Sequence, residues 1–324
     1  MKVLIIGFGQ DAKVLSILLN KKKIFFKLFV KSSANLSLFS PKYFNKDDII
    51  YGDATDLNSL LEVLSKYQFT HVFNLAANSF VQFSAMNFNQ YLRSNTTILT
   101  NLISLNKKNG NFWLYHPLSS EFLNNNNNTD NYLLPRNAYG VSKVTEYFIS
   151  KVAIGEGIRI FFPTLFNHES CFRPGKFFTL KVLDFLLDKE KKKLDIWNTR
   201  SVRDWGSAFQ YMELILEKAI KNDSGEGELG TSIGYKVSDF INNSLEVLEI
   251  NYEFIENKKH SLWKLSDGRQ IYEIDRDPKD EKRIVIANKE NVERTFGKVN
   301  LLHGKKLIDK LTSELITYKN MLFF

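Results

Sequence analysis

The chain has 324 residues, of which 44% are hydrophobic and 25% are charged, an ordinary composition for one large globular domain or two smaller ones. Its net charge of +8 is spread along the sequence, and the lysine runs at 21–23 and 191–193 lack interleaved aromatic residues, so binding to nucleic acid or to a membrane surface is not expected. One cysteine excludes an internal disulfide, and the apolar runs are too short for a signal peptide or a membrane span, so we expect a cytoplasmic protein.

Short apolar runs alternate with amphipathic segments through the first half of the chain. The runs predict strands at 2–7, 25–31, 70–77, 111–120 and 159–167, and the segments between them predict helices at 12–21, 58–67, 91–106 and 139–152. Strand–helix alternation at this spacing is typical of an α/β fold with a parallel, doubly wound sheet. After about residue 166 the alternation weakens, which predicts a smaller C-terminal α/β cap.

The first predicted strand runs into Gly7-Phe8-Gly9-Gln10-Asp11-Ala12, a G-x-G-x-x-A pattern that opens a helix. Glycines let the backbone turn tightly, and the N-terminus of the following helix can hold a pyrophosphate. Such a pattern means little by itself, but here it has the strand before it and the helix after it that a dinucleotide site requires. We therefore expect Gly7, Gly9, Gln10 and Asp11 to bind a dinucleotide cofactor.

The end of the second predicted strand indicates which dinucleotide is bound. An NAD site usually has an acidic residue there for the ribose 2′-hydroxyl, whereas this chain has Lys31-Ser32-Ser33. A cation and hydroxyls suit a 2′-phosphate, which favours NADP, although NAD stays possible and Lys31 could simply be an exposed lysine. Asp53 follows the next short strand, where it could accept a hydrogen bond from the adenine amino group.

The segment NAYGVSK contains Tyr139 and Lys143, four residues apart. On a helix these side chains share one face, one turn apart. An ammonium beside a phenol favours the phenolate, so Tyr139 could act as a base near neutral pH. The alternative is a tyrosine and a lysine on a solvated helix face with no chemical role.

Several stretches together carry a family resemblance: GFGQDA, YGDATD, NLAANSFVQFS, SSE, PRNAYGVSK, LFNHES and RDWG. They resemble the extended short-chain dehydrogenase/reductases, and within these the chain is most similar to the GDP-mannose 4,6-dehydratases. The likeness covers about residues 1–210, and LFNHES, followed by Arg173, and RDWG are its most specific parts. It implies a Rossmann-type NADP-binding domain at 1–165 with 200–230 returning to it, and a sugar-nucleotide-binding cap at 166–199 and 231–324. It also implies a homodimer, or a dimer of dimers, formed through two long helices.

The resemblance implies a dehydratase that oxidises C4 of a hexose, eliminates water across C5 and C6, and returns hydride to C6. Tyr139 would take the C4 hydroxyl proton, and Lys143 would lower the pKa of Tyr139 and bind the cofactor ribose. Ser119 would hydrogen-bond the C4 oxygen. Glu121 would be the acid and base at C5 and C6, a role that is needed once a carbon-bound proton must leave.

Further residues carry substrate and cofactor roles by the same resemblance. Ala76 would line the cofactor site, Ser84 would contact the hexose, and Asn167 would bind the diphosphate. Arg203 would pair with a phosphate, as planar guanidinium groups do well, and Arg276 falls near a late phosphate-binding arginine of the family. Glu169 and Arg173 lie on the loop that leads to the nucleotide pocket. No metal site is expected.

Departures from the family pattern surround the predicted site. The glycine loop is one residue shorter than usual and ends in Ala12, Phe122-Leu123 replaces a Tyr-Gly pair, and His116-Pro117 is unusual. They suggest a divergent member, with a GDP-sugar such as a heptose as an alternative substrate. Two other functions stay open: a sister enzyme that does only C4 redox chemistry (a 4-epimerase, 4-dehydrogenase or 4-keto reductase), and a non-catalytic dinucleotide-binding protein.

Overall fold

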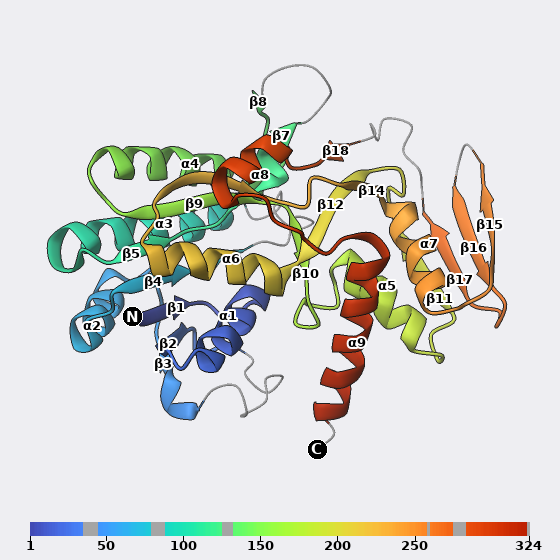
Figure 1. Ribbon diagram of the computed structural model, residues 1–324, viewed down its shortest axis with the longest axis horizontal. Helices are drawn as coiled ribbons and strands as arrows, with labels where there is room; N and C mark the ends of the chain where they lie inside the picture. The colour runs from blue at the N-terminus through green and yellow to red at the C-terminus, as the bar shows by residue number, and fades with distance from the viewer. Residues whose placement is uncertain (35–44, 79–87, 125–131, 258–259, 275–282, 323–324) are drawn as a thin grey trace.

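A computed structural model of the chain describes residues 1–34, 45–78, 88–124, 132–257, 260–274 and 283–322 (Figure 1). Two of the predicted substrate-binding residues, Ser84 and Arg276, lie outside these ranges. A large sheet with helices on both faces occupies the N-terminal side of the molecule, and a smaller group of helices and strands occupies the C-terminal side.

The large sheet is parallel and doubly wound, which confirms the expected fold class. Its strands have the spatial order β13-β9-β5-β4-β1-β2-β3, with β6 paired to β9, and every pair is parallel. Because the chain winds outward from β1 in both directions, the order reverses between β1 and β4, and ligands bind outside the carboxyl ends of the strands at such a point. The strands are β1 (Lys2–Ile6), β2 (Phe25–Val30), β3 (Ile49–Tyr51), β4 (His71–Asn74), β5 (Trp113–Tyr115), β6 (Leu118–Ser119), β9 (Ile160–Leu165) and β13 (Gly225–Leu229).

Helices cover both faces of this sheet (Figure 1). Val3 and Ile5 of β1 point to one apolar core, and Leu4 and Ile6 point to the other. A parallel strand buried on both faces therefore appears in the sequence as a continuous apolar run. The helices on the first face are α1 (Gln10–Lys21) and α6 (Ala208–Lys221), and those on the second are α2 (Leu57–Tyr67), α3 (Phe88–Leu105) and α4 (Ala138–Gly155).

The start of α4 is fixed by a side-chain cap. Asn137 accepts a hydrogen bond from the backbone N–H of Gly140 at 2.8 Å, which satisfies one of the free donors of the first turn. The helix therefore begins at Ala138, so Tyr139 lies in the first turn and Lys143 one turn later. Both side chains face the carboxyl edge of the sheet.

The strand predicted at 111–120 is interrupted. Proline has no backbone N–H to give to a sheet, and the pairing breaks between β5 and β6 at His116-Pro117. After β6 a short 3₁₀ helix, Ser120–Phe122, turns the chain away from the sheet. The break sets Ser119 and Glu121 at the strand end, next to α4.

The C-terminal side has its own apolar core, formed by α5 (Phe178–Leu187), α7 (Val237–Val247), α9 (Gly304–Leu322) and a second sheet. That sheet has the order β11-β17-β16-β15, and Trp263 of β16 is fully buried in it. Since α6 and β13 return to the large sheet, we propose 1–165 with 200–230 as one unit and 166–199 with 231–324 as the cap. The cap strands are β11 (Lys193–Ile196), β15 (Tyr252–Glu256), β16 (Ser261–Leu265) and β17 (Gln270–Glu273).

A third, small sheet connects the two sides. Its strand β12 (Val202–Ser207) pairs with β10 (Asn167–Glu169), β14 (Gly234–Lys236) and β18 (Ile284–Val285), and leads directly into α6. The residues of this sheet therefore lie between the large sheet and the cap. The remaining elements are two 3₁₀ or π turns (Lys46–Asp48 and Asn106–Gly110), the hairpin β7 (Leu123–Asn124) and β8 (Tyr132–Leu133), and α8 (Lys289–Phe296).

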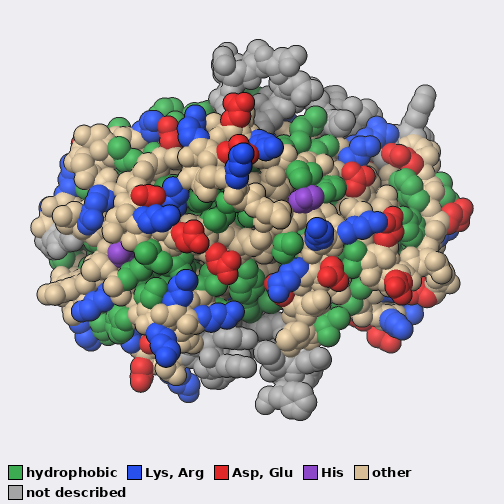
Figure 2. Space-filling model, viewed as in Figure 1, with side chains coloured by type: hydrophobic (Ala, Val, Ile, Leu, Met, Phe, Trp, Pro, Cys, Tyr) green, Lys and Arg blue, Asp and Glu red, His purple; other side chains and the backbone are tan. Residues whose placement is uncertain are grey.

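Charged side chains of both signs are interspersed over the face of the molecule that Figure 2 presents. None of the helices in the described ranges is long and apolar enough to cross a membrane. The described residues also contain no group of three or more His, Cys, Asp or Glu side chains placed to hold a metal ion.

Candidate active site

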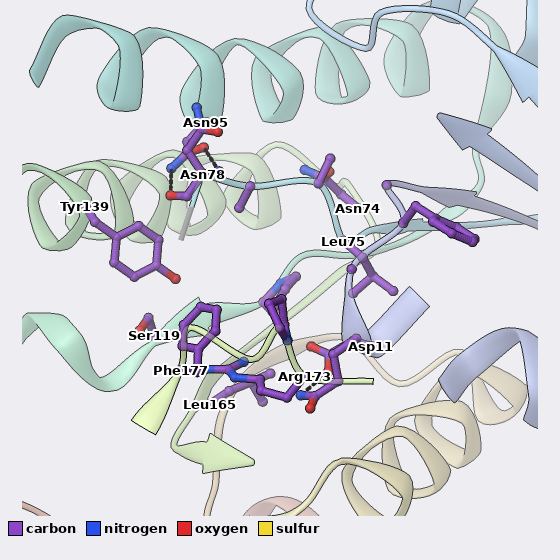
Figure 3. Close-up of a pocket in the computed structure, with 18 of the residues that line it drawn as sticks. Asp11, Asn74, Leu75, Asn78, Asn95, Ser119, Tyr139, Leu165, Arg173 and Phe177 are labelled. Atoms are coloured by element: carbon purple, nitrogen blue, oxygen red, sulfur yellow. Dashed lines mark hydrogen bonds between the residues drawn. The ribbon is translucent and has the colours of Figure 1, made fainter. Parts of the chain in front are cut away.

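A cavity of about 1010 Å³ opens at the carboxyl edge of the large sheet and extends to the cap (Figure 3). Most of the predicted site residues line it, whereas Ser32, Asp53, Glu169 and Arg203 are not among its described lining residues. The predicted residues that do line it are Gly7, Gly9, Gln10, Asp11, Lys31, Ala76, Ser119, Glu121, Tyr139, Lys143, Asn167 and Arg173.

The glycine turn after β1 fits a dinucleotide. Gly7 has a φ of +104°, which side-chain-bearing residues rarely adopt, and a Cβ there would lie 2.9 Å from the backbone nitrogen of Ala76. Gly9 faces open space, with nothing within 4 Å of a Cβ built on it. The N-terminus of α1 follows at Gln10, so its unpaired backbone N–H groups can receive the negative charge of a pyrophosphate.

Gln10 and Asp11 also tie this helix to the segment after β9. Gln10 donates to the backbone oxygen of His168 at 2.9 Å and accepts from the backbone N–H of Ser170 at 2.9 Å. Burial alone would raise the pKa of Asp11, but His168, 3.1 Å away, and Arg173 lower it below its ordinary value. Conversely, Asp11 outweighs burial and raises the pKa of His168. Arg173 lies beside Asp11 in the cavity (Figure 3). Its positive charge compensates the carboxylate, which would otherwise repel a pyrophosphate bound at the N-terminus of α1.

Where the adenosine part of the cofactor is expected, Lys31, Asp53 and Thr55 form a small network of an ion pair and hydrogen bonds at the protein surface. The Lys31 ammonium lies 3.3 Å from the Asp53 carboxylate, and both side chains are about half exposed. Asp53 also accepts from the backbone N–H of Thr55 at 2.9 Å and from its hydroxyl at 2.8 Å. The Asp53 carboxylate therefore already interacts with Lys31 and Thr55, whereas Lys31 and Ser33 line the cavity.

Tyr139 is almost fully buried, with 8% of its surface exposed. Burial is the largest influence on its pKa and raises it, while Lys143 and a hydrogen bond with Ser119 lower it. Glu146 and Glu121 raise it further. The pKa of Tyr139 therefore lies above the ordinary tyrosine value, whereas the Tyr139–Lys143 spacing alone predicts the opposite net direction.

Lys143 has a partner that the sequence reasoning missed. Its ammonium donates to the Glu146 carboxylate at 2.7 Å and to the backbone oxygen of Pro117 at 3.0 Å. Burial alone would lower the pKa of Lys143, but Glu146 and Tyr139 raise it above its ordinary value. The i,i+3 spacing of Lys143 and Glu146 on the predicted helix was a signal that could have revealed the pair.

Glu121 is held by a second unexpected partner, Arg283. The guanidinium donates to the Glu121 carboxylate at 2.8 Å and to the Glu121 backbone oxygen at 3.1 Å. Both side chains are largely buried, with 23% of Glu121 and 12% of Arg283 exposed. Because 162 residues separate the two in sequence, no local pattern predicts this contact.

The predicted phosphate ligand Arg203 lies behind Arg283. It donates to the backbone oxygens of Val202 and Arg283, both at 3.0 Å. Burial, followed by the charge of Arg283 and a smaller contribution from Arg136, lowers the pKa of Arg203 to about 10, although Glu121 opposes this. Arg283 and Arg136 thus place further positive charge near Arg203, and none of these three arginines is among the described residues that line the cavity.

On the cap side, Glu169 orients Arg173. The Glu169 carboxylate is buried, accepts from the Thr179 hydroxyl at 2.7 Å and lies 3.5 Å from Nε of Arg173. The Arg173 guanidinium lies over the Phe177 ring, 3.8 Å from its centroid. Asn167, at the start of β10, lines the same part of the cavity. An aromatic ring and a cation therefore face the cofactor end from the cap.

Comparisons with known proteins agree with this geometry. A family model for GDP-mannose 4,6-dehydratase matches residues 4–308. The GDP-mannose 4,6-dehydratase of Vibrio cholerae is 29% identical over 222 residues, covering 63% of this chain and 58% of the relative. A GDP-mannose 4,6-dehydratase of Sordaria araneosa is 26% identical over 277 residues, covering 81% of this chain and 50% of the relative. The chain thus spans between half and three fifths of these two relatives.

Solved structures share the fold across the whole chain. The dTDP-glucose 4,6-dehydratase of Bacillus anthracis, solved with NAD, superimposes with a TM-score of 0.78 at 14% identity, covering 99% of this chain and 98% of that one. The UDP-glucose 4-epimerase of Thermotoga maritima gives a TM-score of 0.79 at 13% identity, covering 98% and 99%. At these identities the likeness establishes the fold alone.

We predict different effects for the same substitution at the two glycines of the turn. Gly7→Ala should destabilise the protein by about 1–3 kcal/mol. The backbone of Gly7 has a positive φ, and a Cβ on it would collide with the backbone of Ala76. Gly9→Ala should cost less than about 1 kcal/mol, since its Cβ meets open space. Urea unfolding of both variants measures the difference, and equal stabilities would contradict the assigned turn.

Proposed function

Because the chain belongs to the GDP-mannose 4,6-dehydratase family, we propose that it converts GDP-mannose, or a close GDP-sugar such as a GDP-heptose, to the 4-keto-6-deoxy sugar. The convergence of Ser119, Glu121, Tyr139 and Lys143 on one wall of the cavity is the observation that carries this proposal. It brings a hydroxyl, a carboxylate, a phenol and an ammonium to the edge of the sheet where α/β folds bind ligands.

The first half of the chemistry is assigned to Tyr139 and Ser119. A bound nicotinamide cofactor would accept hydride from C4 and later return it. Tyr139 takes the proton of the C4 hydroxyl, and Ser119, which hydrogen-bonds Tyr139, holds the C4 oxygen. Only 8% of the Tyr139 surface is exposed, so the phenol has little contact with bulk water.

The second half is assigned to Glu121, which removes the C5 proton and gives a proton to the leaving C6 hydroxyl. The 4-keto group acidifies C5, so a carboxylate is a sufficient base. Arg283 supports this role because it holds the side chain in one orientation at the cavity wall. The same contact favours one rival function, an enzyme that does only C4 redox chemistry, in which Glu121 stays paired with Arg283 throughout.

The GDP linkage is proposed from the names of the relatives and from the charge of the site. Arg283 contacts Glu121, Arg203 lies near Arg283 and Arg136, and Arg173 lines the cavity on the cap side. Such positive charge suits the diphosphate of a sugar nucleotide. We also propose a cytoplasmic location, which the single cysteine and the shortness of the apolar runs led us to expect.

We predict that the purified protein, given GDP-mannose and catalytic NADP, forms a product one water lighter with no net reduction of cofactor. Glu121→Gln should lower dehydration by roughly 10²–10⁴-fold and leave C4 oxidation intact. Mass spectrometry of the sugar nucleotide and cofactor absorbance measure both steps. Glu62→Gln, the same change at an exposed position on α2, is the matched control.

Other outcomes of this assay separate the rivals. C4 oxidation or epimerisation without loss of water, in the wild type and in Glu121→Gln alike, would establish the redox-only enzyme. Intact substrate across a panel of GDP-, UDP- and dTDP-sugars, with cofactor still bound, would establish the non-catalytic protein. Turnover of a GDP-heptose but not of GDP-mannose would support the proposed dehydratase reaction with a GDP-heptose as its substrate.

We propose NADP as the cofactor, because Lys31 and Ser33 line the cavity at the end of β2. Lys31→Ala should weaken NADP binding about ten- to hundredfold and leave NAD binding nearly unchanged, since a hydrogen bond to a charged group contributes about 1.5–3 kcal/mol. Asp53→Asn should tighten NADP binding, because it removes the carboxylate 3.3 Å from the lysine. Isothermal titration with both cofactors tests this, and tighter wild-type binding of NAD would reject it.

We propose a homodimer formed through α3 and α4. On α4, Phe148 and Val152 lie one turn apart with 55% and 61% of their surfaces exposed, so they form a contiguous apolar pair that a second copy of the chain could cover. Val152→Lys should therefore shift the protein to monomers in light scattering. Ile220→Lys, a similar change on α6 where 51% of the side chain is exposed, should leave the dimer intact. A monomeric wild type would contradict the proposal.

A further inference from the structure

A buried group of ionisable side chains lies directly behind Tyr139. Lys143, Glu146 and His116 have 3%, 0% and 2% of their surfaces exposed. One oxygen of Glu146, Oε2, lies 2.7 Å from Nζ of Lys143 and 2.8 Å from Nε2 of His116. The Lys143 ammonium lies 5.8 Å from the centre of the Tyr139 ring. The group is therefore continuous with the predicted catalytic tyrosine.

The hydrogen bonds define the protonation of this group. The Asn74 amide donates to Nδ1 of His116 at 3.0 Å, so the ring proton lies on Nε2 and is donated to Glu146. Burial lowers the pKa of His116, although Glu146 opposes this, which agrees with a neutral ring. The group thus holds one positive charge on Lys143 and one negative charge on Glu146. Of these three side chains, Lys143 and Glu146 act on the pKa of Tyr139 directly, and Glu121 acts on it from the cavity side.

Stability alone gives no reason for this arrangement. A buried ion pair often contributes less than apolar side chains of the same volume would, because removing two charges from water is costly. Here the second oxygen of Glu146 and the side-chain oxygen of Asn74 are buried, and in the described residues neither has a hydrogen-bond partner. Unsatisfied buried oxygens cost further free energy. A carboxylate in this position is therefore better explained by its effect on Lys143 and Tyr139.

We propose that Glu146, held by His116, is a positioning residue for the reaction: it fixes the Lys143 ammonium and partly cancels its charge, so that Tyr139 works as a base in a more alkaline pH range than Lys143 alone would set. The expected effect of Glu146 on turnover rests on the proposed function. Its effect on the titration of Lys143 and Tyr139 does not, because it requires no substrate.

The sign of the effect follows from charge. The carboxylate favours the protonated ammonium of Lys143 and opposes the phenolate of Tyr139, so it raises the proton affinity of both groups. Removing it must lower the pH at which the Tyr139–Lys143 pair loses its first proton. This direction holds whichever of the two groups loses that proton, because the pair titrates as a unit.

We predict that Glu146→Gln moves the acid limb of the pH profile of kcat/KM to lower pH by about 1–3 units, the size of effect that a charge at this distance produces. A residue with a merely structural role would lower the rate without moving the limb. The matched control is Glu226→Gln, because Glu226 also pairs with a lysine of α4, Lys151 at 3.1 Å, but is exposed. That control should leave the profile in place.

A second variant separates charge from general disturbance of the buried group. His116→Gln keeps an N–H donor for Glu146 but leaves the net charge of the group unchanged, because the histidine is neutral. It should therefore leave the acid limb within about half a unit of the wild type. A shift in His116→Gln as large as that in Glu146→Gln would overturn the assignment to the carboxylate.

A direct titration keeps the inference testable without any substrate. The full chain is labelled with ¹³Cζ-tyrosine, and the Tyr139 signal is identified by its loss in Tyr139→Phe. Its midpoint should lie at or above the ordinary tyrosine value of about 10 in the wild type and should fall in Glu146→Gln. Equal midpoints, or a wild-type midpoint below that value, would overturn the inference. If Glu146→Gln does not fold, the same titration is made on Glu146→Met, which also removes the charge at similar volume, and equal midpoints there would overturn the inference. Failure of every sugar nucleotide to react would bear on the proposed function alone.

Discussion

Parallel pairing of the central strands is the constraint on which the site depends. Strands β1, β4, β6 and β9 all run in the same direction, so their carboxyl ends meet at one edge of the sheet. Ser119 at the end of β6, and Gly7, Ala76 and Asn167 just after the other ends, all line the same cavity. The backbone pairing of the strands is thus enough to place residues that are far apart in sequence at one edge of the sheet. Helix α4, capped by Asn137, then adds Tyr139 and Lys143 to that edge.

Charge pairing is the second organising feature of the cavity. Asp11 is paired with His168, Glu121 with Arg283, and Lys143 with Glu146. Each pair keeps a side chain to which we assign a functional role in a fixed place and close to electrical neutrality. An unpaired charge in a largely buried site would carry a large desolvation cost. The opposite charge of each partner lowers that cost and so allows these side chains to be buried. The positive charge of Arg203 and Arg283 next to Glu121 supports the proposed diphosphate ligand.

The sequence predicted those features that depend on local pattern. The alternation of apolar runs predicted the doubly wound sheet, and the spacing of Gly7 and Gly9 predicted the turn that a Cβ at Gly7 would block. It did not predict the break at Pro117 within what looked like one strand, or any element of the cap, where the periodicity is weak. The contact between Arg283 and Glu121 depends on how the third sheet brings distant segments together, which no window of sequence contains. The net pKa shift of Tyr139 was misjudged because it depends on burial, and burial follows from the completed fold.

The central claim is that Ser119, Glu121, Tyr139 and Lys143 support one reaction sequence at this edge: with a bound nicotinamide cofactor as the hydride carrier, C4 is oxidised, water is eliminated across C5 and C6, and the same hydride returns to C6. The most direct test uses GDP-mannose with deuterium at C4 of the sugar, with the product analysed by NMR and mass spectrometry. The account predicts a 4-keto-6-deoxy product that carries the deuterium at C6, with no build-up of reduced cofactor. Deuterium that leaves with the cofactor, or returns to C4 without loss of water, would contradict it.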